Sequence, residues 1–229
     1  VNELKEKPKV LLLENVKYIF THDKKRTFQI IQNKLEETGY CVFAKVLNTC
    51  DYTEIPQNRE RTFIICFLEG QNAYLDPSMP MSTHFQKIFP PKRTNKSKPI
   101  SEFLEHDEVD EKYYYRQDKY NYKELVNSIT KKDTVYQWRR IYVRENKSGV
   151  CPTLTANMGT GGHNVPLIKD DHGIRKLTPR ECFNLQGFPK NFKFPDDVPN
   201  SQLYKQAGNS VTVDMIKKLA EIIYDCLNN

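Results

Sequence analysis

The sequence predicts an α/β fold, in which part of an open parallel sheet is joined to a small, irregular, β-rich domain. Three observations lead to this prediction. Short apolar runs alternate with a helical pattern over residues 1–70, prolines and basic residues then interrupt it, and an amphipathic helical pattern closes the chain. Such apolar runs are typical of strands that helices cover on both faces.

The first expected element is an apolar run at residues 9–14, directly after a proline. Its continuous hydrophobicity predicts a buried strand of a parallel sheet. Glu14 falls at the C-terminal end of this strand, where open α/β sheets bind their ligands. A carboxylate is costly to bury unless it is paired or used. Glu14 is therefore either an acid exposed just past the strand or a residue with a chemical role.

A helix is expected at residues 23–38, with Asp23 as its N-cap and Gly39 at its end. Residues 40–47 and 62–68 alternate as strands do. The first 70 residues therefore have the pattern of the last part of a parallel α/β sheet.

The character of the chain changes after about residue 75. Five prolines lie in residues 75–99 with basic residues between them, which indicates a surface connection or a domain boundary. Residues 105–125 are charged and rich in tyrosine, and residues 134–168 hold short β-prone pieces. This part predicts the small, irregular, β-rich domain.

Two helices are expected towards the C-terminus. Thr178 with Glu181 predicts a capping box, which makes Cys182 a packed helix residue rather than a nucleophile. The last helix is expected at residues 211–227, after a turn glycine and two capping residues at positions 208–210. The apolar residues expected on its buried face are Val213, Ile216, Ala220, Ile223 and Leu227.

Composition bounds the class of protein. A chain of 229 residues forms one large domain or two small ones. The net charge of +6 is compatible with a polyanionic partner without requiring one. The six cysteines show no metal-binding spacing and are expected to be reduced, so no metal site is predicted. No apolar stretch is long enough to span a bilayer, and we expect a soluble, cytoplasmic protein.

Arg59 and Arg61 lie two residues apart, so an extended chain would direct both to the same side. Paired guanidinium groups bind phosphate or a base carbonyl in a forked geometry. The alternative is an ordinary charged loop that leads into a strand.

A basic and aromatic cluster contains Gln137, Arg139 and Arg140 beside the single tryptophan of the chain. Arginine and glutamine side chains hydrogen-bond to base edges in the major groove. A solvated β-hairpin is the competing interpretation.

The loop at residues 151–163 is rich in glycine and small hydroxyl residues. Backbone N–H groups and hydroxyls of such a loop contact phosphates, which fixes register without reading sequence. The residues proposed for this contact are Thr153, Thr155, Gly161 and Gly162. A plain, turn-rich loop is the alternative.

Four blocks of sequence occur in a characteristic order. They are Glu-Asn-Val at 14–16, Gln-Asn-Arg-Glu-Arg at 57–61, Thr-Pro-Arg-Glu-Cys at 178–182 and Gln-Ala-Gly-Asn-Ser-Val at 206–211. Together they resemble the C-terminal part of the bacterial restriction–modification DNA cytosine-5 methyltransferases, from the sixth conserved motif of that family to the tenth. The resemblance covers essentially the whole chain.

The resemblance implies roles for individual residues. Glu14 would contact N3 of a flipped-out cytosine, Arg61 would hold the O2 of that base, and Arg59 is the partner of Arg61 in the same motif. Asn209 and Ser210 would line the pocket for S-adenosylmethionine. The implied reaction is transfer of a methyl group from this cofactor to C5 of cytosine.

The resemblance also implies a partial Rossmann-like methyltransferase sheet and a target recognition domain that binds double-stranded DNA. Thr153 would help to fix the DNA backbone, and the cluster around residues 137–140 lies where base-reading residues occur in some members. The expected division is residues 1–89 as part of the catalytic domain, 90–178 as the recognition domain, 179–203 as a hinge segment, and 204–229 as a helix returning to the catalytic domain.

The sequence departs from the family in one respect. It contains neither the Pro-Cys dipeptide that carries the nucleophile nor the glycine-rich cofactor loop. We therefore expect a fragment, or one subunit of a split enzyme, whose missing motifs lie on a missing N-terminal segment or a second chain. Alternatives are a non-catalytic DNA-binding remnant and an RNA methyltransferase of the related class.

Overall fold

A computed structural model describes two compact units of the chain, each built from separate stretches of sequence. Unit 1 comprises Val1–Tyr52, Glu60–Thr94 and Met215–Asn229, and unit 2 comprises Thr53–Arg59 and Asn95–Asp214. Within them, the structure describes residues 1, 3–70, 81–106, 108–119, 121–139, 141–160 and 164–228.

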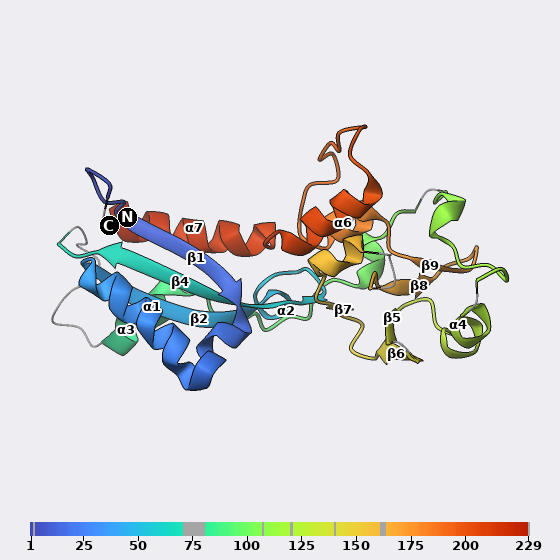
Figure 1. Cartoon of the computed structure of the whole chain (residues 1–229), viewed down its shortest axis with the longest axis horizontal. Coiled ribbons are helices and arrows are strands. Elements are labelled where there is room, and N and C mark those ends of the chain that lie inside the picture. Colours follow the sequence, from blue (N-terminus) through green and yellow to red (C-terminus); the bar gives the residue numbers. More distant parts are fainter. Residues whose placement is uncertain are drawn as a thin grey trace. The chain divides into compact units, whose positions relative to one another are not determined.

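Unit 1 contains a three-stranded sheet in the order β1-β4-β2 (Figure 1). Its strands are β1 (Val10–Val16), β4 (Glu60–Leu68) and β2 (Tyr40–Asn48). The central strand β4 runs antiparallel to both neighbours, so the expectation that these strands belong to a parallel sheet was wrong. Continuous apolar runs report burial on both faces of a sheet and carry no information on strand direction.

Helices cover both faces of this sheet. Phe28, Ile31 and Leu35 of α1 (Arg26–Glu37) pack on one face, against Ile64 and Cys66 of β4. The other face packs against α3 (Met81–Ile88) and α7 (Val213–Asn228). The sheet therefore lies in the middle of three layers, which explains why its strands are apolar on both sides.

The start of α1 differs from the expectation. Asp23 does not cap the helix, because Asp23, Lys24 and Lys25 all have positive φ angles of 49°, 54° and 75°. This left-handed stretch separates Asp23 from the helix, which begins at Arg26, and Asp23 instead pairs with Arg26. The expected end is confirmed, since Gly39 follows the helix with φ of 87°.

The helix α7 also differs from the expectation. It begins at Val213, and positions 208 and 209 belong to the preceding helix α6 (Asn200–Asn209). The buried residues of α7 are Met215, Leu219 and Cys226, with Ile216, Ile222 and Ile223 partly buried beside them. The predicted face is therefore confirmed at Ile216 and Ile223, whereas Ala220 is exposed. Val213 and Leu227 are exposed.

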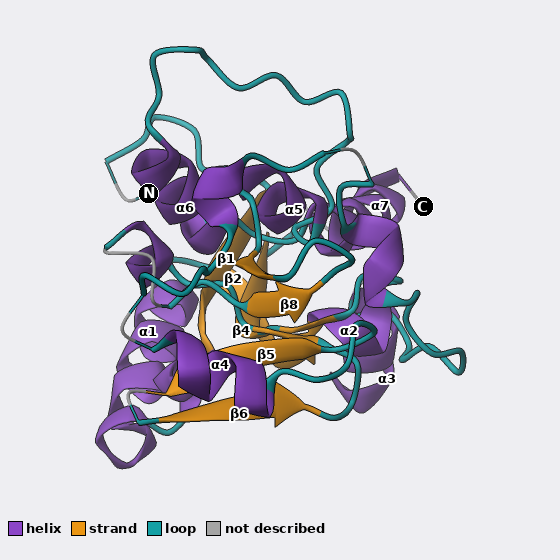
Figure 2. Cartoon of the chain, turned by 90° about the vertical axis from the view of Figure 1, so that its right-hand side faces the viewer, coloured by secondary structure: helices purple, strands orange, loops and turns teal. Residues whose placement is uncertain are grey.

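Unit 2 contains a four-stranded antiparallel sheet and a short parallel pair. The order β6-β5-β8-β9 comprises β6 (Tyr142–Asn146), β5 (Val135–Arg139), β8 (Leu167–Lys169) and β9 (Ile174–Lys176). The parallel pair is β3 (Gln57–Asn58) with β7 (Cys151–Pro152). The strands are short, and α4 (Tyr122–Ser128) packs across β5 and β6 (Figure 2).

The remaining helical elements are short. In unit 1 they are η1 (Lys17–Phe20), η2 (His22–Lys25) and α2 (Thr49–Tyr52). In unit 2 they are η3 (Ile100–Phe103), η4 (Glu111–Tyr113), η5 (Ala156–Gly159) and α5 (Pro179–Asn184).

The predicted capping box of α5 is confirmed. Thr178 accepts a hydrogen bond from the Glu181 backbone N–H at 3.2 Å, and Glu181 accepts one from the Thr178 N–H at 2.8 Å. Cys182 is fully buried in this helix, as expected for a packed residue. Two of the orphan donors at the start of α5, the N–H groups of Thr178 and Glu181, are therefore satisfied by side chains.

Glu181 has a second role that the sequence did not reveal. It accepts two hydrogen bonds from the buried Arg175, at 2.8 and 2.7 Å, and Arg175 also donates to Asp170 at 2.7 Å. Burial alone would lower the pKa of Arg175, but these carboxylates outweigh burial and raise it. The charged cluster ties β9 to the start of α5.

Candidate functional site

Unit 1 brings two of the predicted site residues together. Arg61 Nε lies 2.9 Å from Glu14 Oε1, so the two side chains form an ion pair. The register aligns Glu14 with Phe63 and Val16 with Arg61, which makes the pair diagonal neighbours on one face of adjacent antiparallel strands. Glu14 lies within β1 rather than at its end.

The pair is partly open to solvent. The side chains of Glu14 and Arg61 are 29% and 16% exposed. Burial lowers the pKa of Arg61, and the charge of Glu14 opposes that shift. Arg61 Nη1 donates to the Glu60 carbonyl at 2.8 Å. Among the described residues, neither Glu14 Oε2 nor Arg61 Nη2 has a hydrogen-bond partner, so the pair retains one acceptor and one donor for a ligand.

Arg59 makes different contacts from Arg61. It is 3% exposed and belongs to unit 2, where Nη1 donates to the Leu154 carbonyl at 2.8 Å. Nη2 donates to the carbonyls of Gly208 and Ser210, at 3.2 and 2.5 Å. A buried guanidinium that donates to three backbone carbonyls holds the chain in place, and these contacts give Arg59 no access to a base.

The predicted cofactor residues lie at the end of α6. Asn209 is exposed and is the last residue of the helix, and Ser210 is its C-cap. The Ser210 hydroxyl donates to the Ala207 carbonyl at 2.8 Å. The Asn209 side chain has no hydrogen-bond partner among the residues that the structure describes, so its amide is available to a ligand.

Gly208 does not act as a turn glycine, because it lies inside α6. A Cβ atom at this position would overlap the backbone of Thr155 and Ala156. Glycine is therefore required for close approach of two backbones rather than for its conformational freedom.

Unit 2 has a polar cavity of about 380 Å³ beside the β5–β6 hairpin. Of its lining residues in the described part of the chain, two are arginines and none is acidic. The lining consists of Asn58, Gln137, Arg139, Arg144, Asn146, Ser148, Val150, Pro152, Thr153, Thr155 and Asn164. Positive charge with amides and hydroxyls is the chemistry that binds phosphates and base edges.

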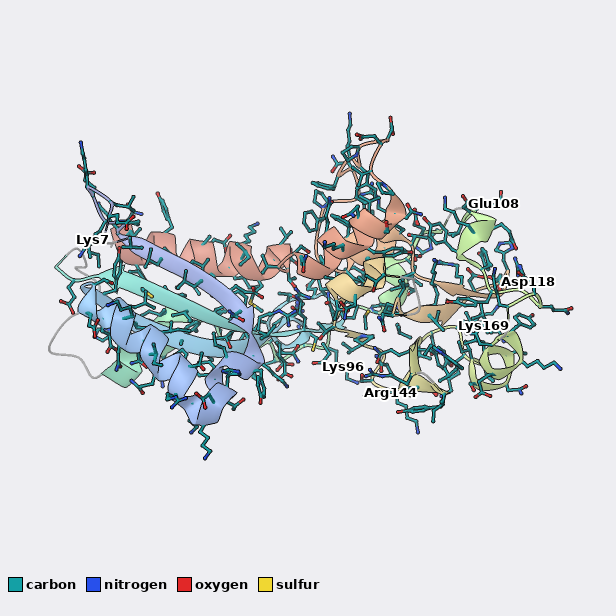
Figure 3. All side chains as sticks on the ribbon, in the orientation of Figure 1. Lys7, Lys96, Glu108, Asp118, Arg144 and Lys169 are labelled. Carbon is teal, nitrogen blue, oxygen red and sulfur yellow. The ribbon has the colours of Figure 1, made fainter. Side chains whose placement is uncertain are left out.

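The two faces of the β5–β6 hairpin have different environments. Tyr136 and Trp138 of β5 and Val143 of β6 pack with the apolar residues of α4. The alternate residues Gln137 and Arg144 are paired across the strands and line the cavity, and Figure 3 labels Arg144 on this hairpin. The period of two that defines strands therefore separates a packed face from a polar face.

The structure thus brings four of the predicted DNA-binding residues to one cavity: Gln137, Arg139, Thr153 and Thr155. Arg140, Gly161 and Gly162 lie outside the described residues. Arg144 follows the basic and aromatic cluster closely in the sequence but was not among the predicted site residues, and its pairing with Gln137 in the hairpin brings it to the cavity. The prediction also omitted Asn58, Asn146, Ser148 and Asn164, whose approach depends on tertiary structure.

The cysteines of this chain are poor nucleophiles. Burial is the main cause that raises the pKa of each of the six thiols. The pKa rises to about 11 for Cys50 and Cys226 and to about 12 for Cys66. Because the thiolate is the nucleophilic form, these thiols are not suited to covalent catalysis near neutral pH.

In the part of the chain that the structure describes, no helix is long and apolar enough to cross a membrane. No group of three or more His, Cys, Asp or Glu side chains in the same ranges is arranged to hold a metal ion.

The chain resembles bacterial enzymes along nearly its whole length. It is 50% identical over 220 residues to the type II methyltransferase M.Bsp6I of Bacillus sp. (strain RFL6), covering 96% of this chain and 66% of that protein. It is 39% identical over 227 residues to the type II methyltransferase M.HaeII of Haemophilus aegyptius, covering 97% and 63%. The chain therefore spans about two thirds of the length of these relatives.

Solved structures share the fold. The S. pombe Dnmt2 methyltransferase superposes with a TM-score of 0.72 at 18% identity, covering 100% of this chain and 70% of that one. The Entamoeba histolytica methyltransferase EhMeth superposes with a TM-score of 0.66 at 19% identity, covering 100% and 66%. The family model described as C-5 cytosine-specific DNA methylase matches residues 3–225. The chain belongs to the C-5 cytosine-specific DNA methylase family.

Proposed function

We propose that this chain acts in S-adenosylmethionine-dependent methylation of cytosine C5 in double-stranded DNA, at a specific sequence and within a restriction–modification system. Its location is the bacterial cytoplasm, where the DNA is. Unit 1 holds the target base, and unit 2 acts as the target recognition domain. The proposal rests on membership of the family, on the similarity to type II methyltransferases and on the geometry of the Glu14–Arg61 pair.

The Glu14–Arg61 pair is the observation that carries the proposal. A cytosine presents N3 and O2 side by side on its Watson–Crick edge, and the Glu14–Arg61 ion pair leaves Glu14 Oε2 and Arg61 Nη2 without partners among the described residues. Glu14 with a proton would donate to N3, which makes C6 more open to attack, and Arg61 would donate to O2. A stacked base cannot reach the pair, so the target base has to leave the duplex.

Asn209 and Ser210 fit a role in holding S-adenosylmethionine. The exposed Asn209 amide offers a donor and an acceptor to a polar small molecule, and the Ser210 hydroxyl, whose proton goes to the Ala207 carbonyl, remains an acceptor. When bound, S-adenosylmethionine supplies the methyl group. The role of these residues is to bind and orient it.

The reaction also requires a thiolate that adds to C6, and we propose that it comes from outside these 229 residues. All six thiols here have raised pKa values with burial as the main cause. Among the described residues β1 pairs only with β4, and Leu13 and Val16 on it are exposed. An open strand edge with exposed apolar residues is suited to receive another strand.

The test is a methyl-transfer assay with tritium-labelled S-adenosylmethionine and mixed-sequence duplex DNA. The chain is assayed alone and together with a polypeptide that carries the glycine-rich loop and the Pro-Cys dipeptide. We expect transfer only in the mixture, and loss of transfer with Glu14→Ala or Arg61→Ala. Glu37→Ala is the matched control, because it removes an exposed carboxylate from an ion pair in the same unit. Duplex binding with no transfer in the mixture would favour a non-catalytic DNA-binding protein.

A further inference from the structure

Two side chains that precede β4 fix the backbone of Leu154. The Leu154 N–H donates to Gln57 Oε1 at 3.2 Å, and the Leu154 carbonyl accepts from Arg59 Nη1 at 2.8 Å. Gln57 and Arg59 are both buried. The neighbours Thr153 and Thr155 line the polar cavity, so the position of these two residues depends on how Leu154 is held.

The same guanidinium reaches a second stretch of chain. Arg59 Nη2 donates to the carbonyls of Gly208 and Ser210, which stand on either side of Asn209. The N–H groups of a guanidinium point in fixed directions in one plane. One rigid group therefore sets the position of Leu154 relative to both carbonyls.

The two stretches also touch directly. A Cβ at Gly208 would overlap the backbone of Thr155 and Ala156, and a Cβ at Gly159 would overlap the carbonyl of Ser201. These contacts lie near opposite ends of α6, so the helix packs on the segment after Leu154 along its length. A displacement of that segment is transmitted to α6, because packed backbones have no room to absorb it.

We propose that Arg59 is a positioning residue that couples DNA contact at the segment Thr153–Thr155 to the backbone of Gly208–Ser210, where the cofactor is proposed to bind. This inference rests on the proposed function. Coupling between two binding sites is reciprocal. If DNA at the cavity strengthens binding at the end of α6, the cofactor strengthens DNA binding by the same factor.

Amide hydrogen exchange by NMR tests the coupling in the full chain. The Leu154 N–H reports on one stretch, and the Ser210 N–H, which donates to the Gln206 carbonyl at 2.9 Å, reports on the other. The probe is a pool of mixed-sequence duplex DNA. We expect the duplex to slow exchange at both amides roughly fivefold or more. In Arg59→Lys we expect only the Leu154 amide to slow, because lysine has one nitrogen and cannot bridge both stretches.

Arg175→Lys is the matched control. Arg175 is a second buried arginine of unit 2, and its hydrogen bonds go to Asp170, Glu181 and Lys176. Its replacement should lower stability while the duplex still slows both amides. A purely structural role for Arg59 predicts the same behaviour for Arg59→Lys, and that result would overturn the proposal.

The wild-type chain alone also tests the coupling, and this test can be made even if Arg59→Lys does not fold. Slowing at Leu154 without slowing at Ser210 would overturn the coupling and leave the proposed DNA contact intact. No change at either amide, with no duplex binding by fluorescence anisotropy, would remove the DNA contact and the coupling together.

Discussion

The hydroxyl of Thr153 donates a hydrogen bond to the backbone carbonyl of Asn58 at 2.6 Å. The hydroxyl proton is thus used within the protein, and a phosphate oxygen, which accepts hydrogen bonds, cannot receive it while this bond persists. In the proposed DNA contact, the role of Thr153 is therefore to hold its own segment in place. Thr155, two residues on, is exposed, and it is better placed to donate to phosphate.

This relationship gives a prediction for Thr153. Thr153→Val should weaken duplex binding by roughly fivefold, the effect of losing one hydrogen bond of about 1 kcal/mol, whereas Thr153→Ser should bind like the wild type. Fluorescence anisotropy with a labelled duplex measures both. Equal binding by the valine and serine variants would show that the bond to Asn58 does not matter for DNA.

Glu14 and Arg61 should be essential for methyl transfer in the mixture described above. Glu14→Gln keeps the shape of the side chain but cannot protonate the base, so we expect a rate lower by about 10²–10⁴-fold. Arg61→Lys removes the forked donor and should lower the rate by about 10²-fold. Single-turnover kinetics with saturating DNA separates these effects from weaker binding. A glutamine variant within threefold of the wild-type rate would contradict the role of Glu14.

Arg139 and Arg144 should both contribute to DNA binding, and the salt dependence distinguishes their contacts. Neither has an ion-pair partner in the part of the chain that the structure describes, so each charge is available to DNA. An arginine that contacts phosphate adds about 0.9 to the slope of log affinity against log salt, and its loss weakens all sequences equally. An arginine that reads a base changes sequence preference instead.

We expect Arg139, which is exposed and ends β5, to contact phosphate. We expect Arg144, which is paired with Gln137, to contact a base. Selection of bound duplexes from a random pool, followed by salt titration of alanine variants, measures both properties. Lys119→Ala is a control, because Lys119 is an exposed basic side chain of unit 2 that forms an ion pair with Asp118. An unchanged sequence preference in Arg144→Ala would exclude base reading by this residue.

The Arg175–Glu181 pair should contribute strongly to stability. The two side chains are 2% and 0% exposed, and removing one partner of a buried pair leaves an uncompensated charge. We expect Arg175→Met to lower the free energy of unfolding by about 3–5 kcal/mol in urea denaturation. Breaking the exposed Arg116–Glu111 pair with Arg116→Met should cost less than about 1 kcal/mol. Similar losses for the two variants would contradict the importance of burial.

The buried thiols predict a loss of stability at alkaline pH. Burial raises the pKa of Cys66 to about 12, above its value in an unfolded chain. The folded state therefore retains the proton while the unfolded state releases it, so this contribution is full below the unfolded pKa and is lost as pH rises towards 12. Urea midpoints should fall between pH 9 and pH 11, and less steeply in Cys66→Ala. Identical slopes for the two proteins would contradict the assignment.

The sequence predicted elements whose signals are local. The capping box at Thr178, the end of α1 at Gly39 and the burial of Cys182 follow from neighbouring residues, and all were confirmed. The prediction of Asp23 as an N-cap was wrong because Asp23, Lys24 and Lys25 adopt positive φ angles. This stretch contains no glycine or asparagine, which would have indicated such angles in the sequence. The predicted direction of β4 relative to its neighbours was wrong because the residues that pair in this sheet lie far apart in the sequence.

The sequence predicted which residues belong to the candidate site better than it predicted what each of them contacts. The ion pair of Glu14 with Arg61 needs the alignment of β1 with β4, about 47 positions apart, and no local pattern specifies that register. Arg59 looked equivalent to Arg61 because the two share a motif, yet its hydrogen bonds end on backbone carbonyls. Burial separates these two arginines, and burial is a property of the folded chain.

The composition of unit 1 has a consequence for synthesis of the protein. Its core combines residues of β2 and β4 with Met215, Leu219 and Cys226 of α7, whereas unit 2 ends at Asp214. Chains fold as they leave the ribosome from the N-terminus onwards. The sheet of unit 1 is translated before α7, so the part of the face that α7 covers stays exposed until this helix emerges. Unit 2 can therefore complete its folding before unit 1. The strands β1, β2 and β4 are synthesised well before α7, the helix that completes their core.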